Sequence, residues 1–394
     1  MIDAMKAAEG VFGKVVEWRR DFHMNPELSN QEVRTPKKVA EVLRGLGTME
    51  VTEVCGGHGV VGLLRGKKGG KTIAIRADMD ALPVQEQNTF EYRSRTDGVM
   101  HACGHDGHTA ILLGAATILS EMRSSLAGNV KFIFQPAEES LADSGAVQMV
   151  KAGVLKNPDV DAIFMLHLFP FVPSGVLQIG DGPVCAGAGK VTITVQGKGG
   201  HGSQPHKAVD ALLTACQIVD ALQMAVMRNV NVLDPAVLTI GQLHAGSAAN
   251  VIADSAMMEG TVRTYTTQAE DAVEAAIKRI IAGAAMMSGA TASLDFVRLI
   301  PAVTNNADLA RMAKQACAAA LPQGSAKPLA EPLMGSEDFA FYLKAGVPGA
   351  MLMLGGGIEG AEIFPNHSPK FNWDENAMKA GMAAFVSIAL EYLK

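Results

Sequence analysis

Apolar and polar positions follow two different patterns along the chain, and the change between them marks its organisation. Up to about residue 183, continuous apolar runs at 60–66, 71–82, 129–136 and 161–170 alternate with stretches of helical spacing. Continuous apolar strands separated by helices are typical of an α/β layer with a largely buried sheet. We therefore predict an α/β domain in the first part of the chain.

A different pattern follows. Residues 190–199 alternate apolar and polar side chains, which is typical of a half-buried strand. The next segment has helical spacing, and its predicted apolar face consists of Val209, Leu212, Leu213, Cys216 and Val219. This face would make Cys216 a small core residue. With two further strands, a helix at 268–286 and a last strand, the order is β-α-β-β-α-β, the split βαβ arrangement of a ferredoxin-like sandwich.

After Pro301 the first pattern returns, with helical spacing at 309–321, an apolar strand at 350–356 and a last amphipathic helix. The simplest architecture is a discontinuous domain built from both chain ends. We predict an α/β domain of residues 1–185 and 299–394, into which a smaller α+β domain of residues 186–298 is inserted.

Charge and composition exclude several classes of protein. The chain has 34 Lys and Arg against 40 Asp and Glu, a formal charge of −6, which argues against a general nucleic-acid binder. The chain has no run of about 18 apolar residues, so no membrane span is predicted. Its first residues do not have the pattern of a signal peptide. The five cysteines are odd in number and far apart, which favours reduced thiols in the cytoplasm over a disulfide framework.

Chemistry-bearing residues gather where the apolar strands end, which is where open α/β sheets place their sites. Asp78 and Asp80 close one strand and point to the same side of an extended chain, although alone they could simply cap a turn. Residues 101–108 hold three of the ten histidines and one cysteine. Cys103 and His105 could both reach one metal, because thiolate and imidazole suit zinc and related ions.

A third cluster, Glu138 and Glu139, follows the strand at 129–135. One of two adjacent acids can coordinate a metal while the other acts as a general base on water, whereas alone they could form a solvated turn. Two single histidines follow in the chain and complete a set of candidate donors: Cys103, His105, Glu139, His167 and His367. Five donors are too many for one tetrahedral ion and suit a two-metal centre.

The predicted inserted domain carries a glycine-rich segment at 197–206, GKGGHGSQPH. Such loops can bind phosphate, so a nucleotide site is the competing interpretation. The segment lacks the GK[ST] ending of a P-loop and has no Rossmann strand–helix context. We interpret His201 as an electrophilic donor to a reacting carbonyl.

Eight motifs occur in one order along nearly the whole chain: RRDFHMNPELSNQE, RADMDALPV, MHACGHDGHTA, FQPAEE, LHLFP, GKGGHGSQPH, GSEDFAFY and NHSPKF. In these motifs the chain resembles the metallopeptidase family of aminoacylase, carboxypeptidase G2 and succinyl-diaminopimelate desuccinylase. Within it, the chain is similar to the branch of hippurate hydrolases and auxin-conjugate amidohydrolases. The resemblance implies a mixed-sheet catalytic domain of the zinc-peptidase type with an inserted ferredoxin-like lid and dimerisation domain.

The resemblance also assigns roles. The branch's metal ligands match Cys103, His105, Glu139, His167 and His367. Cys103 stands where other members place a bridging Asp, and Asp78 stands where other branches have a ligand His. Glu138 matches the general base, and Asp80 matches the acid that orients a metal ligand.

In the lid domain, His201 matches a histidine that stabilises the oxyanion in the partner's site of dimeric members. Asn250 and Arg263 match residues that bind the substrate's carboxylate, for which a guanidinium is well suited.

The expected activity is hydrolysis of N-acyl amino acids to a carboxylic acid and a free amino acid, with two divalent ions per subunit drawn from Zn, Mn, Co and Ni. The expected partners are this small substrate and a second copy of the chain, joined through the inserted domain, with no nucleic acid or membrane. A dipeptidase or carboxypeptidase, a non-catalytic metal-binding protein and a nucleotide-binding protein are the alternatives.

Overall fold

The computed structural model describes residues 3–67 and 70–394. Their contacts divide the chain into two compact units. The first, here called the catalytic unit, comprises residues 1–184, 304–332 and 338–394, and the second, the inserted unit, comprises residues 185–303 and 333–337. The short segment 333–337 belongs by its contacts to the inserted unit, although it lies far along the chain from the rest of that unit.

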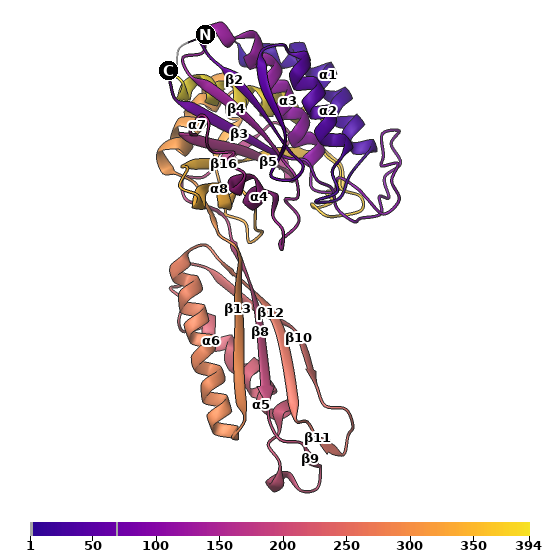
Figure 1. Cartoon of the computed structure of the whole chain (residues 1–394), viewed down its shortest axis with the longest axis vertical. Coiled ribbons are helices and arrows are strands. Elements are labelled where there is room, and N and C mark those ends of the chain that lie inside the picture. The colour runs from indigo at the N-terminus through magenta and orange to yellow at the C-terminus, as the bar shows by residue number, and fades with distance from the viewer. Residues whose placement is uncertain (1–2, 68–69) are drawn as a thin grey trace. The chain divides into compact units, whose positions relative to one another are not determined.

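The catalytic unit is built on an eight-stranded mixed sheet in the order β1-β2-β4-β3-β5-β16-β6-β15, which confirms the predicted α/β class (Figure 1). The bounds of these strands are β1 Met49–Cys55, β2 Gly59–Arg65, β3 Thr72–Asp78, β4 Asn129–Gln135, β5 Ala162–Pro173, β6 Leu177–Ile179, β15 Ala326–Pro328 and β16 Gly349–Gly357. The central strands β4, β3, β5 and β16 run parallel to one another, so their carboxyl ends meet at one edge.

Helices cover both faces of this sheet. Their bounds are α1 Ala4–Met24, α2 Arg34–Gly45, α3 His105–Glu121, α4 Gly145–Lys151, α7 Ala307–Ala320, α8 Ala340–Lys344 and α9 Ala377–Tyr392, with a 3₁₀ turn η1 at Arg123–Ser125. Helices α1, α2, α3, α7 and α9 share one large apolar core with the sheet. The central helix α3 is buried nearly all round, as its continuous run of small and apolar residues requires.

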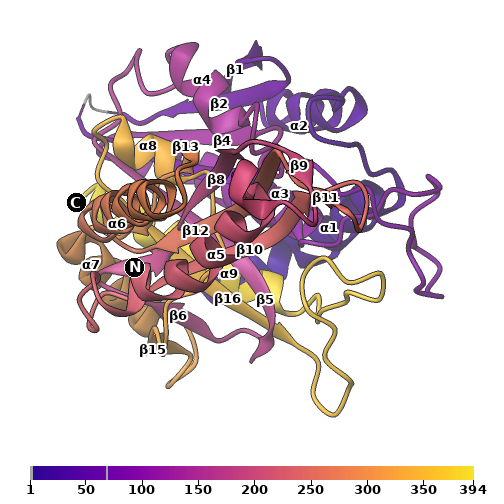
Figure 2. The ribbon, with the colours of Figure 1, turned by 90° about the horizontal axis from the view of Figure 1, so that it is seen from below.

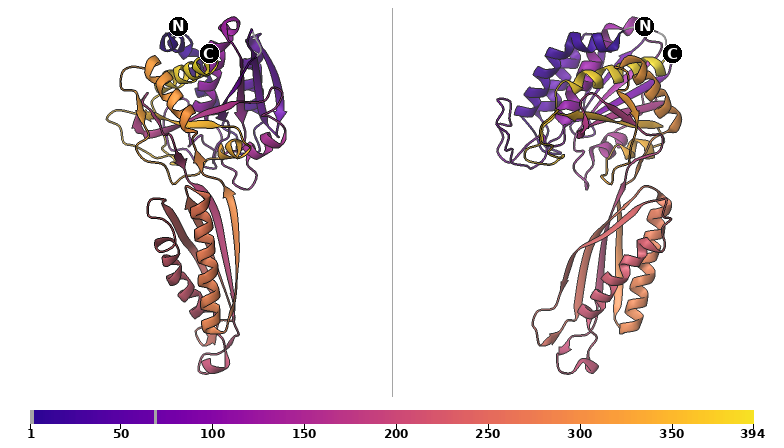
Figure 3. Two further views of the ribbon diagram at one scale, coloured as in Figure 1. Left: turned by 90° about the vertical axis from the view of Figure 1, so that its left-hand side faces the viewer. Right: turned by 180° about the vertical axis from the view of Figure 1, so that it is seen from behind.

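The inserted unit has the predicted order of strand, helix, strand, strand, helix, strand. Its four-stranded antiparallel sheet, in the order β10-β12-β8-β13, carries α5 and α6 side by side (Figures 2 and 3). The bounds are β8 Gly187–Gln196, α5 Ala211–Met227, β10 Ala236–Ala245, β12 Ser255–Thr264, α6 Thr267–Ser288 and β13 Thr291–Ile300. Four short strands and a 3₁₀ turn complete the chain: β7 Pro183–Cys185, β9 Gly200–His201, β11 Val251–Ile252, β14 Val303–Thr304 and η2 Pro205–Lys207.

The predicted buried face of α5 is wrong. Cys216 is exposed, and the side chains of Leu212 and Leu213 are 41% and 56% exposed. The helix instead packs through small residues and a second apolar stripe: Ala211, Thr214, Ala215, Ile218, Leu222 and Ala225. Because α5 is apolar almost all round, periodicity alone could not decide which stripe faces the sheet, and the small side chains allow the closer approach.

No helix in the described parts of the chain has the length and apolar character that crossing a bilayer would require.

Gly349 provides a test of the packing between β16 and β5. A Cβ at this position would lie 2.4 Å from the carbonyl oxygen of Ile163 in the neighbouring strand. We expect Gly349→Ala to destabilise the protein by about 1–3 kcal/mol, because backbone rather than a flexible side chain must move. The control is Gly10→Ala on α1, where a Cβ meets nothing within 4 Å among the described residues and which should stabilise by about 0.5–1 kcal/mol. Equal thermal unfolding midpoints for the two variants would contradict this packing.

Candidate metal centre and active site

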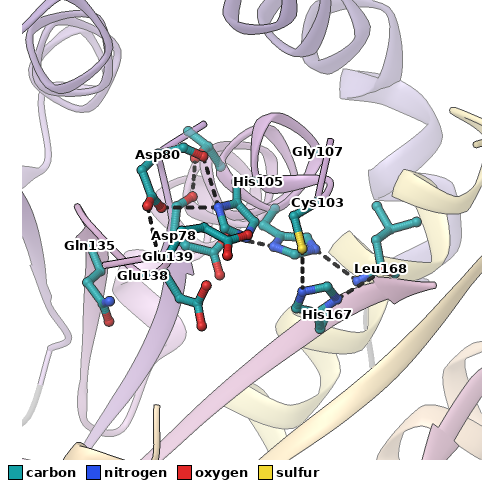
Figure 4. A network of polar contacts seen from close by, with 12 residues as sticks. Asp78, Asp80, Cys103, His105, Gly107, Gln135, Glu138, Glu139, His167 and Leu168 are labelled. Carbon is teal, nitrogen blue, oxygen red and sulfur yellow. Dashed lines mark hydrogen bonds and ion pairs between the residues drawn. The ribbon is translucent and has the colours of Figure 1, made fainter. Parts of the chain in front are cut away.

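Three parallel strands deliver polar side chains to the same edge of the main sheet. Strand β3 ends at Asp78, β4 ends three residues before Glu138, and β5 carries His167. Helix α3 begins at His105, directly after Gly104, whose φ of +91° suits glycine and turns the chain into the helix. These side chains converge in Figure 4. The predicted convergence of the strand-end clusters is therefore present in the fold.

The two ring nitrogens of His105 differ in their hydrogen bonding. Its Nδ1 lies 2.9 Å from the carbonyl oxygen of Asp80 and 3.1 Å from the Asp80 carboxylate, so Nδ1–H donates to Asp80. Its Nε2 is buried and has no hydrogen-bond partner among the described residues. Burial opposes the charged form of His105, but Asp78 and Asp80 outweigh it and raise its pKa well above the ordinary value. A cation at Nε2 would take the place of that proton.

Donor atoms form two overlapping groups that share one sulfur. Cys103, His105 and His167 offer ligand atoms within 4.8 Å of one another, and so do Cys103, Glu139 and His367. Cys103 Sγ lies 3.5 Å from His167 Nε2, and His367 Nε2 lies 3.2 Å from Glu139 Oε1. The structure thus brings together all five predicted ligands, and the two groups that share Cys103 would hold two ions.

The chemistry of the donors supports a cation at this site. Burial and the nearby Glu139 carboxylate raise the pKa of the Cys103 thiol to about 12, so this group becomes a thiolate at neutral pH only beside a positive charge. Glu139 Oε1 is buried, and the ring nitrogen Nε2 of His367, itself a candidate donor, lies 3.2 Å from it. The His167 Nδ1–H donates to the Leu168 carbonyl oxygen at 3.0 Å, which leaves Nε2 as a lone-pair donor.

Asp78 and His108 belong to a third group of possible ligands, but hydrogen bonds already occupy their polar atoms. The His108 Nδ1–H donates to Asp78 Oδ1 at 2.6 Å, and His108 Nε2 accepts the Leu168 N–H at 2.9 Å. The other oxygen of Asp78 pairs with Arg76 at 2.6 Å. Asp78 therefore serves the internal network of the protein, at the position where other branches of the resembled family have a ligand histidine.

Arg76 is the centre of that network and was missed by the sequence analysis. Its guanidinium is completely buried and contacts Asp78 at 2.6 Å, Asp338 at 2.7 Å and Gln135 at 2.8 Å. Asp338 also accepts the Ser144 hydroxyl at 2.6 Å. A single arginine within the apolar run 71–82 was a signal for a buried charge, but its partner 262 positions later was not readable from the chain.

Glu138 lies beside the candidate donors. Its side chain is 8% exposed, and its carboxylate, with His105 and Glu139, forms a group whose ligand atoms lie within 4.8 Å. The backbone N–H of Asp338 approaches Glu138 Oε1 at 3.4 Å. The adjacent Glu139 is held separately, because its backbone N–H donates to Asp80 Oδ2 at 3.0 Å.

In the inserted unit, His201 and Asn250 lie side by side. Strand β9 pairs with β11, which begins directly after Asn250, and the Gly202 N–H donates to the Asn250 carbonyl oxygen at 2.8 Å. The Ser203 backbone N–H donates to His201 Nδ1 at 3.2 Å, and the Ser203 hydroxyl lies 2.8 Å from the same atom. Because Nδ1 accepts, the neutral ring carries its proton on Nε2 and can act as a donor there.

Arg263 lies at the opposite end of the inserted unit's sheet. Arg263 pairs with Ala188 at the start of β8, whereas Ser255, near the β9–β11 pair, aligns with Gln196 at the end of β8. Eight residues of extended strand at about 3.3 Å each separate the two ends, or roughly 26 Å. Within one chain, the structure does not bring Arg263 to His201 and Asn250.

Comparisons with known proteins show which family the chain belongs to. Residues 74–391 match the sequence model of Peptidase family M20/M25/M40. The chain belongs to this family. All the donors of the candidate metal centre lie inside the matched range.

Solved structures of similar proteins share the fold. A putative aminohydrolase from methicillin-resistant Staphylococcus aureus is 37% identical with a TM-score of 0.93, and the match covers 100% of this chain and 99% of that one. A dinuclear metal-binding peptidase of the M20 family from Bacillus subtilis is 37% identical with a TM-score of 0.86, over 98% of this chain and 99% of that one.

Named relatives include three hydrolases. An N-acetylcysteine deacetylase of Bacillus subtilis is 39% identical over 97% of each chain. A thermostable carboxypeptidase of Saccharolobus solfataricus is 39% identical over 96% of this chain and 95% of its own length. An N-acyl-L-amino acid amidohydrolase of Geobacillus stearothermophilus is 43% identical over 72% of this chain and 75% of its own. This member of the family is a metal-dependent amide hydrolase, as the resemblance implied.

The Cys103 thiol provides a test of the metal centre. Because its pKa is about 12, we expect it to lose one proton when a metal binds at pH 7, and this group alone makes affinity rise about tenfold per pH unit. Cys103→Asp supplies a carboxylate that is already ionised, so Mn²⁺ binding should release about one proton fewer. Calorimetry in buffers of different ionisation enthalpy measures this difference. Equal proton release by the native chain and the variant would exclude Cys103 as a ligand.

Proposed function

We propose that this chain hydrolyses the amide bond of N-acyl amino acids, releasing a carboxylic acid and a free amino acid. The observation that carries the proposal is Glu138, a buried carboxylate beside the two donor groups that share Cys103. Two relatives are named for removing acyl groups from amino acids or cysteine, which supports this substrate class.

The proposed ligands are Cys103, His105, Glu139, His167 and His367. Two divalent ions bound by them would supply Lewis-acid activation of the amide carbonyl and of water. Zn, Mn, Co and Ni all accept this mixture of sulfur, nitrogen and oxygen donors, and we propose no single metal. Asp80 orients the His105 ring through its contact with Nδ1.

Glu138 is the proposed general base. Its carboxylate takes a proton from the attacking water and then delivers it to the leaving nitrogen, so one group serves both steps. His201 donates from Nε2 to the oxyanion that develops on the carbonyl oxygen, and Ser203 holds the ring in the required tautomer. Arg263 and Asn250 bind the carboxylate end of the substrate.

We propose further that the active protein is a homodimer joined through the inserted unit. An N-acyl amino acid spans roughly 10 Å when extended, far less than the roughly 26 Å between Arg263 and the His201 end of the sheet. One substrate can meet both ends only if two chains contribute. The exposed side chains of Leu212 and Leu213 on α5 and the edge strand β10 offer surfaces for an isologous contact.

The cytoplasm is the proposed location. All five cysteines are free thiols, which agrees with a reducing compartment.

A carboxypeptidase activity is the second candidate, because one relative with nearly full coverage carries that name. It would use the same metal centre and differ only in the group on the acyl side of the amide bond. Parallel assays of N-acetyl, N-benzoyl and indoleacetyl amino acids against dipeptides distinguish the two.

Glu138→Gln tests the role of the general base. We expect kcat to fall by about 10²–10⁴-fold, because the amide cannot take the proton from water, while the five ligands still bind metal. The measurements are kcat on the best N-acyl amino acid and metal content by elemental analysis. Near-normal kcat with unchanged metal content would remove Glu138 from this role.

Mixing two inactive variants tests action across the dimer. His201→Ala and Glu138→Gln chains are combined under conditions that allow subunit exchange. If His201 acts on the partner's site, each mixed dimer has one intact site, and activity should recover to about one quarter of the native value. Exchange confirmed by native mass spectrometry without recovered activity would show that His201 does not act in the partner's site.

A further inference from the structure

The turn that carries the two glutamates has an unusual backbone. Ala137, between Pro136 and Glu138, is completely buried and has a φ of +50°. A residue with a Cβ rarely adopts this left-handed conformation, and where it does the surroundings must enforce it.

Glu32 holds the backbone of Ala137 through the N–H group. The Ala137 N–H donates to Glu32 Oε1 at 2.8 Å, although the two residues are 105 positions apart. Glu32 is completely buried, and its Oε2 has no hydrogen-bond partner within the described ranges. Backbone N–H groups of Asn30 and of Glu32 itself also bond to this carboxylate, so the buried acid joins its own loop to the turn at Ala137. Burying a carboxylate in this way is costly unless its contacts have a purpose.

Gly145 holds the backbone of Ala137 through the carbonyl group. Its N–H donates to the Ala137 carbonyl oxygen at 3.0 Å. A Cβ on Gly145 would lie 1.7 Å from the Pro136 carbonyl oxygen, so the start of α4 packs directly against the turn. Ala137 is therefore clamped through both its N–H and its C=O.

The left-handed residue changes where the next two side chains point. Consecutive residues of an extended strand point to opposite faces. Glu138 and Glu139 are consecutive, yet each places a carboxylate oxygen within 4.8 Å of a nitrogen of the His105 ring. The turn at Ala137 sits immediately before them and redirects the chain as it leaves β4.

We propose that Glu32 is a positioning residue, which holds Ala137 in the left-handed conformation and thereby aims Glu138 at the reacting centre. This inference rests on the proposed role of Glu138 as the general base. Glu32 has no place among the metal donors, since its contact is with backbone, and Glu139 has its own anchor at Asp80.

Glu32→Ala removes the acceptor, and kcat should fall by about 10–100-fold, because a displacement of about 1 Å at a catalytic group has an effect of this size. Metal content at saturating Mn²⁺ should stay at the native value. Glu32→Gln keeps an oxygen acceptor and should restore most of kcat. The assays are made at pH 8, because burial raises the pKa of Glu32 to about 7 and the native side chain is then mainly a carboxylate.

A second substitution separates positioning from a general loss of structure. Glycine adopts positive φ without strain, so Glu32→Ala combined with Ala137→Gly should recover at least several-fold in kcat over Glu32→Ala alone. Ala137→Gly alone is the reference for this comparison. An unchanged kcat in Glu32→Ala, or full recovery of that variant by added metal, would overturn the proposal, and so would a double variant no better than Glu32→Ala.

A crystal structure of Glu32→Ala gives a readout that does not depend on activity. We expect Ala137 to leave the left-handed region and the Glu138 carboxylate to move. Retention of the native φ with Glu138 in place would overturn the proposal. A wrong assignment of Glu138 as the general base would give a different result. The Glu138→Gln variant would then keep its turnover, whatever the conformation of Ala137.

Discussion

Charge compensation at the carboxyl edge of the main sheet is the constraint on which the site depends. Asp78, Asp80 and Glu138 are buried, and each has a carboxylate oxygen within 4.8 Å of a nitrogen of the His105 ring. Ionised groups removed from water are tolerated only where opposite charges or donors surround them. The fold meets this requirement in two ways, and the division between them separates scaffold from reactive centre.

At the inner half of this edge, around Asp78, the protein's own side chains compensate the buried negative charge. Arg76 lies between Asp78 and Asp338, and His108 closes the other side of Asp78. The outer half of the edge consists of the candidate metal ligands. Cys103 lies beside His167 on one side and forms a group of possible ligands with Glu139 and His367 on the other. The buried His105 Nε2 has no hydrogen-bond partner in the described residues. A pair of divalent ions would supply the positive charge in the outer half that Arg76 supplies in the inner one.

The sequence predicted the α/β class and the clusters of side chains that the structure gathers into the candidate site, for identifiable physical reasons. Continuous apolar runs mark buried parallel strands, and strand ends mark the sites of open sheets, so the donor clusters could be located before the structure was known. Features that depend on distant partners could not be found in this way. The contact of Glu32 with Ala137 joins residues 105 positions apart, and the apolar periphery of α5 gave no sign of which stripe would be buried. The separation of Arg263 from Asn250 required the strand register.

The tie between Arg76 and Asp78 has an evolutionary consequence. A chain with histidine at position 78, as in other branches of the resembled family, would remove the Asp78 carboxylate from a completely buried guanidinium, while the contact with Asp338 would stay. Breaking one side of such a buried pair is strongly destabilising. We therefore expect a substitution at position 78 to be accompanied by a change at position 76. An alignment of the family should show the two positions co-varying, with Asp78 accompanied by Arg76.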